Sequence, residues 1–184
     1  MDFINDIAHP KGAISSATEF LQTHHTIEKA NQLIQWGRKQ NLPIGFVKVG
    51  FSPSYAESPS SSPVFGKAKE FQALNLNAWG TAFLDTLNVF PEDTVIVKHR
   101  VSAFYGTKLE PFLHAQQISH LILAGISTDM VIQHTARDAH DRDYAVTIAS
   151  DGCAARSQEV HDQALSLCER IATIATVDEI LKAY

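Results

Sequence analysis

The chain has 184 residues, of which 45% are hydrophobic and 19% charged, and its net charge is −5. This length suits one domain with its own core, so we expect a single domain over residues 1–184. The sequence has no basic block or stripe, which argues against nucleic acid and against an anionic membrane surface as partners. No apolar run approaches the roughly 20 residues that a membrane span needs. The first ten residues lack the apolar core of a signal peptide.

Two cysteines, Cys153 and Cys168, are the only thiols in the sequence. So few cysteines fit a reduced, cytoplasmic protein without a disulfide framework.

Residues 1–7 carry Asp2, Asn5 and Asp6 in a segment that otherwise looks like the end of a buried strand. On that interpretation, most of the strand would lie before Met1. A start site placed too late, or a trimmed chain, would explain such a beginning.

Apolar runs alternate with amphipathic segments along the rest of the chain. Thr26–Gln40 has Ile27, Ala30, Leu33 and Ile34 at helical spacing, which predicts a helix with one inner face. The further predicted helices are Thr81–Leu87, Leu109–Gln117, Thr128–Asp141, Ser157 to about Arg170, and Asp178–Ala183. The predicted strands are Pro43–Phe51, Thr94–His99, Leu121–Ala124, Ala145–Ala149 and Ile174–Val177.

This alternation is typical of parallel βαβ units with right-handed crossovers. The predicted fold class is therefore α/β, a three-layer α/β/α sandwich with a mostly parallel, Rossmann-like sheet. The Ser- and Pro-rich stretch Ser52–Pro63 predicts a surface loop, which could be a lid, a subunit contact or plain solvated chain.

The stretch His120–Ala139 is the best candidate for the floor of an active site. Its apolar run is closed by Gly125, and Ser127 and the two residues after it can cap the following helix. In an open parallel sheet, such a turn lies at the carboxyl end of a strand, where ligands bind. The N–H groups at the start of the new helix favour negative charge there.

Several stretches together resemble the isochorismatase-like hydrolases, the superfamily of nicotinamidases, N-carbamoylsarcosine amidohydrolases and isochorismatases. Asp2–Asp6 looks like the first-strand motif, and Val97-Lys98 followed by Ser102–Phe104 looks like the lysine motif. The residues that look like the nucleophile motif and the tail pattern are Gly125–Thr128, Thr135–Ala139, Asp151–Ala155 and His161.

The resemblance implies an active site built from an Asp, a Lys and a Cys, and it places Asp2 and Lys98 at the first two positions. In the thiol members, a thiolate attacks an amide carbonyl, the Asp shuttles the proton and backbone N–H groups hold the oxyanion. It also implies a cis peptide at Ile126–Ser127. The Cys position is occupied by Val131, which has no lone pair and cannot act as a nucleophile.

Asp2 and Lys98 would come from strand ends on one sheet edge, so they can meet over one crevice. The pair is either a structural ion pair or an acid/base pair. Our hypothesis is that Asp2 handles the attack of water, Lys98 steers charge, and the backbone N–H groups of Ser127 and Val131 receive negative charge. Isochorismatases of this superfamily also lack the Cys and carry a small Gly there, whereas Val131 narrows the pocket.

Two alternatives remain open from the sequence. The chain could be a non-catalytic metabolite-binding or assembly protein on the same fold. It could also be an amidase with another nucleophile, Cys153 or Ser127, although a buried structural thiol is the better interpretation of Cys153 and of Cys168.

No cofactor and no metal are expected. Nicotinamidases place Asp and His ligands after the second strand, but this chain has no His between Phe51 and Asp93. Phe104 and Trp79 are candidate pocket walls. His99 and Arg100 could make the rim basic and favour an anionic substrate, or could be solvated surface charge. The expected partner is a small-molecule substrate, and the resemblance implies a homo-oligomer.

Overall fold

The computed structural model describes residues 1–183, and its strands form two parallel ribbons. In the first ribbon, β1 (Gly45–Val49) pairs with β2 (Thr94–Lys98). In the second, β4 (Ala145–Ala154) lies between β3 (His120–Ile126) and β5 (Thr173–Ala175). The predicted strands are thus found in place, and β4 is longer than the sequence indicated.

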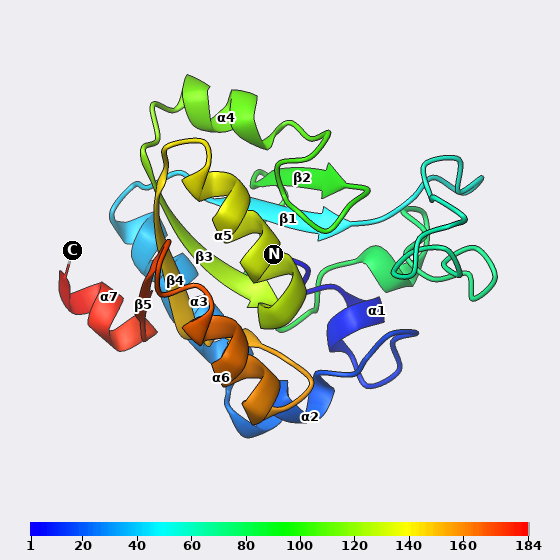
Figure 1. The fold of residues 1–184 in the computed structure, drawn as a ribbon, viewed down its shortest axis with the longest axis horizontal. Helices are drawn as coiled ribbons and strands as arrows, with labels where there is room; N and C mark the ends of the chain where they lie inside the picture. Colours follow the sequence, from blue (N-terminus) through cyan, green and yellow to red (C-terminus); the bar gives the residue numbers. More distant parts are fainter. Residues whose placement is uncertain (184) are drawn as a thin grey trace.

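The first two residues of the chain join the two ribbons. On the β3 side, the Met1 amine donates to the Ala124 carbonyl at 2.8 Å and the Ile126 N–H donates to the Met1 carbonyl at 3.1 Å. On the β1 side, the Asp2 N–H donates to the Val47 carbonyl at 2.8 Å. The amino terminus therefore lies in the middle of the molecule, between β1 and β3 (Figure 1), and continues one sheet across both ribbons.

Helices cover both faces of this sheet, which confirms the predicted three-layer α/β architecture (Figure 1). The side chains of β3 alternate between the faces: Leu121 and Leu123 pack in the cluster that α4 (Leu109–Ala115) and α5 (Gln133–His140) cover. Ile122 and Ala124 point the other way and pack with α7 (Val177–Ala183). The long helix α3 (Thr26–Lys39) lies on this second face as predicted, with Ala30 and Gly37 buried. Successive side chains of β3 thus point to opposite faces, and all are apolar because helices bury the strand on both faces.

Three further helices complete the fold. The sequence did not predict α1 (Asn5–Ala8) or α2 (Thr18–Thr23). Helix α6 (Gln158–Ser166) begins as predicted, since the Ser157 hydroxyl accepts the Val160 N–H at 3.3 Å.

The predicted helix Thr81–Leu87 is wrong. Only a short 3₁₀ turn, η1 (Trp79–Thr81), is present, and Phe83 forms an antiparallel bridge with Ile4. The N–H of Leu84 donates to the Phe3 carbonyl at 3.0 Å. Pairing with the first residues of the chain holds this segment extended, and a local pattern cannot reveal such long-range pairing.

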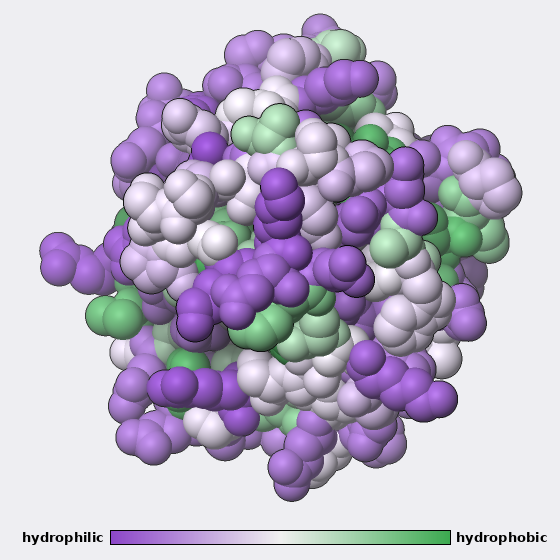
Figure 2. Space-filling model, turned by 90° about the vertical axis from the view of Figure 1, so that its right-hand side faces the viewer, coloured by the Kyte–Doolittle hydropathy of each residue, from purple (hydrophilic) through white to green (hydrophobic). Residues whose placement is uncertain are grey.

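Residues 52–78 form a long irregular excursion, seen at the right of Figure 1. The Ser- and Pro-rich part is not merely solvated, because Tyr55 and Phe65 are buried in a small apolar cluster with Phe51. Figure 2 shows the molecule from that side: hydrophilic side chains predominate and apolar ones form small separate areas. Within residues 1–183, no helix is both long and apolar enough to cross a membrane.

Candidate active site

Asp2 and Lys98 form a buried ion pair at the carboxyl ends of the strands. The Lys98 Nζ lies 2.7 Å from the Asp2 Oδ2, and the two side chains are 1% and 0% exposed. Lys98 is the last residue of β2, and its register partner on β1 is Val49. The Val49 N–H donates to the other carboxylate oxygen, Asp2 Oδ1, at 2.7 Å. The carboxyl ends of strands β1 and β2 thus position the carboxylate of Asp2 beside the ammonium of Lys98.

The Lys98 ammonium has two backbone acceptors besides its ion pair with Asp2. Its Nζ donates to the carbonyl oxygens of Arg100 at 3.1 Å and Val101 at 3.0 Å. The chain after β2 folds back over its own lysine to supply these carbonyls. The Asp2 Oδ2 faces the ammonium but has no hydrogen-bond partner within residues 1–183, and such an unsatisfied buried oxygen is costly.

The turn after β3 forms the other side of the site. The Ile126–Ser127 peptide is cis, as the resemblance implied. A π-helical turn, η2 (Thr128–Ile132), follows and leads into α5. Val131 is buried on η2, so an apolar side chain occupies this turn where a thiol would be needed for attack.

Both cysteines of the chain lie in the core. Cys153 and Cys168 are both free and buried, as predicted. Burial raises the pKa of the Cys153 thiol to about 12, and its Sγ contacts the Leu123 carbonyl at 3.9 Å. Burial also raises the pKa of Cys168. A thiol rather than a thiolate is present at both positions near neutral pH, and the thiol is a poor nucleophile.

The comparisons with known proteins identify the family of this chain. The isochorismatase domain family model matches residues 1–179. The chain belongs to the isochorismatase family. The uncharacterized isochorismatase family protein YecD of Escherichia coli O157:H7 is 34% identical over 161 residues, covering 85% of this chain and 82% of YecD. The ureidoacrylate amidohydrolase RutB of Methylobacterium radiotolerans is 27% identical, covering 92% of this chain and 71% of RutB.

Solved structures of the family have the same fold. An isochorismatase family protein from Burkholderia thailandensis is 28% identical with a TM-score of 0.78, covering 86% of this chain and 82% of that one. The N-carbamoylsarcosine amidase of Thermoplasma acidophilum superposes with a TM-score of 0.74 at 24% identity, over 96% of this chain and 93% of that one. At that identity, the second likeness shows the fold alone.

The structure shows contacts for His161 and Asp6, two residues of the quoted motifs to which the sequence analysis assigned no role. The buried His161 on α6 lies with its Nδ1 2.9 Å from the Thr128 hydroxyl, at the first residue of η2. Burial lowers the pKa of His161, so the ring is neutral and anchors the turn by a hydrogen bond rather than by charge. Asp6 accepts the Leu74 N–H at 2.7 Å and the Ala13 N–H at 3.4 Å. A single His or Asp in a motif does not reveal such long-range contacts.

The two predicted pocket walls lie apart from each other. Phe104 is buried against Tyr144, with ring centroids 5.9 Å apart, and under the Arg142 guanidinium. Arg142 and Tyr144 come after the carboxyl end of α5 in the sequence, whereas Val131 comes before its amino end. Phe104 therefore packs at the end of α5 opposite to Val131. Trp79 is 53% exposed and meets the His9 ring edge-on at 5.0 Å.

Arg100, which follows Lys98, contacts the irregular excursion. Its Nη1 donates to the Glu57 carbonyl at 2.9 Å. The neighbouring His99 has its Nδ1 2.6 Å from the carbonyl of Gly50, just before the excursion. The guanidinium of Arg100 is therefore used in part to hold the excursion beside the site.

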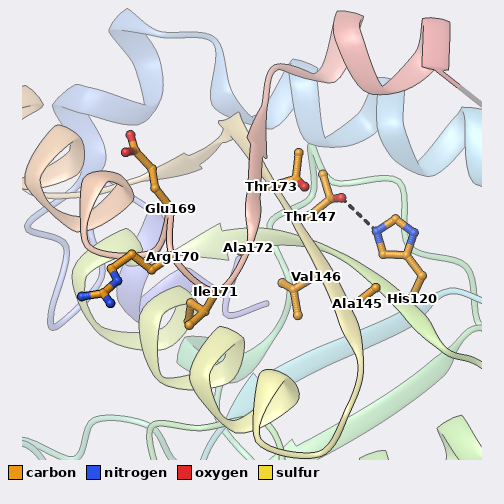
Figure 3. Close-up of a pocket in the computed structure, with 9 residues that line it drawn as sticks. All are labelled: His120, Ala145, Val146, Thr147, Glu169, Arg170, Ile171, Ala172 and Thr173. Carbon is orange, nitrogen blue, oxygen red and sulfur yellow. Dashed lines mark hydrogen bonds between the residues drawn. The ribbon is translucent and has the colours of Figure 1, made fainter.

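A hollow lies at the amino ends of the strands, at the end of the sheet opposite to the Asp2–Lys98 pair. It has a volume of about 590 Å³ and lies where β3 and β4 begin, at His120 and Ala145. Figure 3 shows Glu169 and Arg170 pointing away from the His120–Thr147 pair, so the charged groups do not converge on one point. Ligands of open α/β sheets bind at the other, carboxyl ends. Within residues 1–183, no three His, Cys, Asp or Glu side chains are grouped so that they could hold a metal ion.

The buried α-amino group of Met1 makes the free energy of unfolding depend on pH. Burial lowers its pKa from 8.0 to about 6. Between these two values the unfolded chain binds a proton that the folded chain does not, so stability rises with pH across this window. The expected gain from pH 6 to pH 8 is about 2 kcal/mol, measured by urea unfolding.

Acetylation of the Met1 amine is the control, because it removes the titrating group. His161 also titrates, but its lowered pKa places its effect below the unfolded value of 6.5. The acetylated chain should therefore lose the slope between pH 6.5 and 8. An unchanged slope would show that the amine is not buried.

Proposed function

We propose that this chain is a small-molecule hydrolase that activates water with Asp2 and Lys98 instead of using a thiol nucleophile. The observation that carries the proposal is the buried Asp2–Lys98 ion pair, 2.7 Å apart, next to a turn that bears Val131. A carboxylate held at 0% exposure beside a lysine is costly to bury, and such groups gather at functional sites.

The proposed reaction follows from the groups present. The Asp2 carboxylate takes a proton from water while the water oxygen attacks the substrate carbon. Asp2 then gives that proton to the leaving group, so it ends as the carboxylate. The Lys98 ammonium stabilises the negative charge near Asp2, and the backbone N–H groups of Ser127 and Val131 donate hydrogen bonds to the substrate oxygen as negative charge develops on it.

The substrate class is a small amide, ureide or similar carbonyl compound. The relative RutB carries the name ureidoacrylate amidohydrolase, and this favours an amide-type bond here. The side chain of Val131 narrows the site compared with a glycine. Because Asp2 and Lys98 are covered, neighbouring residues must move aside for substrate to reach them.

A non-catalytic binding or assembly role is the second candidate. The burial of Lys98 favours it, since a solvent-free ion pair whose ammonium also donates to two backbone carbonyls fits a purely structural role. We also expect the chain to form a homo-oligomer and to be cytoplasmic.

Turnover against a panel of small amides, ureides and isochorismate separates these candidates. For one compound we expect hydrolysis by the unmodified chain and a roughly 10²–10⁴-fold loss in Asp2→Asn, the range for loss of a general base. Cys153→Ala is the matched control and should retain turnover, because its buried thiol takes no part. Loss of turnover in Cys153→Ala, with the fold intact by circular dichroism, would point to a thiol route.

The panel also has an outcome that excludes catalysis. If the folded, unmodified chain turns over none of the compounds, while binding of one of them raises its melting temperature, the binding role replaces the hydrolase proposal.

A further inference from the structure

The turn after β3 has a hydrogen-bond pattern that passes over one N–H group. The Ser127 carbonyl accepts the Met130 N–H at 3.3 Å and the Ile132 N–H at 3.2 Å. An α-helix would instead bond this carbonyl to the N–H four residues on, which is that of Val131. Within residues 1–183, the Ser127 carbonyl accepts from residues 130 and 132 and not from residue 131. The π-helical form of η2 therefore withholds this partner from the Val131 N–H, one of the two proposed donors to the substrate oxygen.

Helix α6 packs against η2 and is bonded to both of its ends. At the first residue of η2, the Thr128 hydroxyl lies 2.9 Å from the His161 Nδ1. Directly after its last residue, the Gln133 Nε2 donates to the Ala164 carbonyl at 3.1 Å. His161 and Ala164 are three residues apart and so share one face of α6. The turn is thus held by a helix that carries none of the proposed catalytic residues.

The bond between His161 and Thr128 lies in the interior of the protein. Both residues are buried, and the Phe20 ring of α2 covers the His161 ring with centroids 5.1 Å apart. Phe20 in turn stacks on His24 at 3.9 Å, so the imidazole is enclosed on that side. A polar ring is costly to bury, and an apolar side chain of similar size would fill this space at lower cost. The contact with η2 is therefore the feature that accounts for a histidine at this position.

We propose that His161 is a positioning residue for the hydrolase: through the Thr128 hydroxyl it holds η2 in the form that keeps the Val131 N–H available to the substrate oxygen. The inference rests on the proposed function, because it assigns His161 a part in that reaction. His161 acts on the turn and not on the substrate. Its loss should therefore slow the chemical step, in which charge develops on the substrate oxygen, more than it weakens substrate binding.

Two pairs of variants test this bond from its two ends. His161→Leu and Thr128→Val remove the bond and keep most of the side-chain volume. His161→Asn retains an amide near the place of Nδ1, and Thr128→Ser retains the hydroxyl. For the compound that the panel identifies, we expect kcat to fall roughly 10–100-fold in the first pair, with KM within about threefold of the unmodified chain. The second pair should keep kcat within about threefold.

A second histidine that contacts η2 provides the matched control. The His134 Nδ1 lies 2.9 Å from the Met130 carbonyl, but this side chain is exposed. His134→Leu should therefore leave kcat unchanged. Combining His161→Leu with Thr128→Val should slow turnover no more than either change alone, since both remove the same bond. An unchanged kcat in His161→Leu and Thr128→Val, or a loss confined to KM, would overturn the proposal.

Hydrogen exchange tests the positioning of the turn without turnover. At matched stability, amides of residues 129–132 should exchange at least about tenfold faster in His161→Leu, while those of residues 121–123 in β3 should not change. If the unmodified chain hydrolyses no compound and the amides of η2 still respond in this way, the hydrolase proposal fails and the positioning of the turn by His161 is supported. Unchanged exchange of these amides in His161→Leu would overturn the positioning, whatever the turnover.

Discussion

Lys98→Met should destabilise the protein by about 3–5 kcal/mol, the cost of leaving a buried charge without its partner. The substitution keeps the length of the side chain but removes the ammonium, so the Asp2 carboxylate retains only the Val49 N–H at 2.7 Å. At 0% exposure, water cannot solvate that carboxylate. The melting temperature should fall by roughly 10 °C, measured by thermal unfolding with circular dichroism.

A surface ion pair provides the matched control for this experiment. The Lys29 Nζ lies 3.0 Å from the Asp178 carboxylate, with side chains 26% and 62% exposed. Lys29→Met should therefore cost no more than about 1 kcal/mol, and 1 M salt should reduce even that. The Lys98 effect should persist at high salt. Similar costs for the two lysine variants would mean that the Asp2–Lys98 pair is open to solvent.

A double-mutant cycle separates the interaction from the burial of each charge. Asp2→Asn with Lys98→Met removes both charges, so the double variant should be more stable than Lys98→Met alone. We expect a coupling energy of about 2 kcal/mol or more. Additive single effects would contradict a direct pair, and they would also weaken the proposed hydrolase, which requires the two groups to act together.

The sequence predicts much of this architecture because periodicity reflects burial. The alternation of apolar runs with amphipathic segments placed β1 to β5 and α3 to α7, and β3 with its following turn is where the pattern is clearest. Met1 and Asp2 show the limit. Two residues carry no periodicity, yet their hydrogen bonds to Val47 and Ala124 join the two ribbons into one sheet.

The candidate site likewise has features that the sequence predicted and features that depend on long-range contacts. Lys98 could be placed because Val97-Lys98 resembles the family's lysine motif, and its position at the end of an apolar strand then put its charge at the edge where ligands bind. The two backbone acceptors of its ammonium could not be foreseen, because they depend on the carbonyls of Arg100 and Val101 turning back over the side chain. The failed helix at Thr81–Leu87 has a similar cause, since its backbone is used for pairing with residues 3–5.

Gly125→Ala should be among the most damaging single substitutions in the chain, with an expected loss of about 3 kcal/mol or more. A Cβ at this position would strike the Met1 carbonyl oxygen and lie 3.0 Å from the Met1 nitrogen, and the backbone of Gly125 has a φ of +153°. The obstacle is backbone rather than a flexible side chain. Either β3 or the amino-terminal segment must move, and Asp2 would move with it.

Gly106→Ala is the control that separates this steric effect from the cost of backbone conformation. Gly106 has a φ of +65° and open space around the position of a Cβ, so alanine there should cost only about 1–2 kcal/mol. Thermal unfolding of both variants measures the difference. A loss for Gly125→Ala no greater than that for Gly106→Ala would mean that Met1 is not held against β3. The geometry that positions Asp2 beside Lys98 would then have to come from β1 alone.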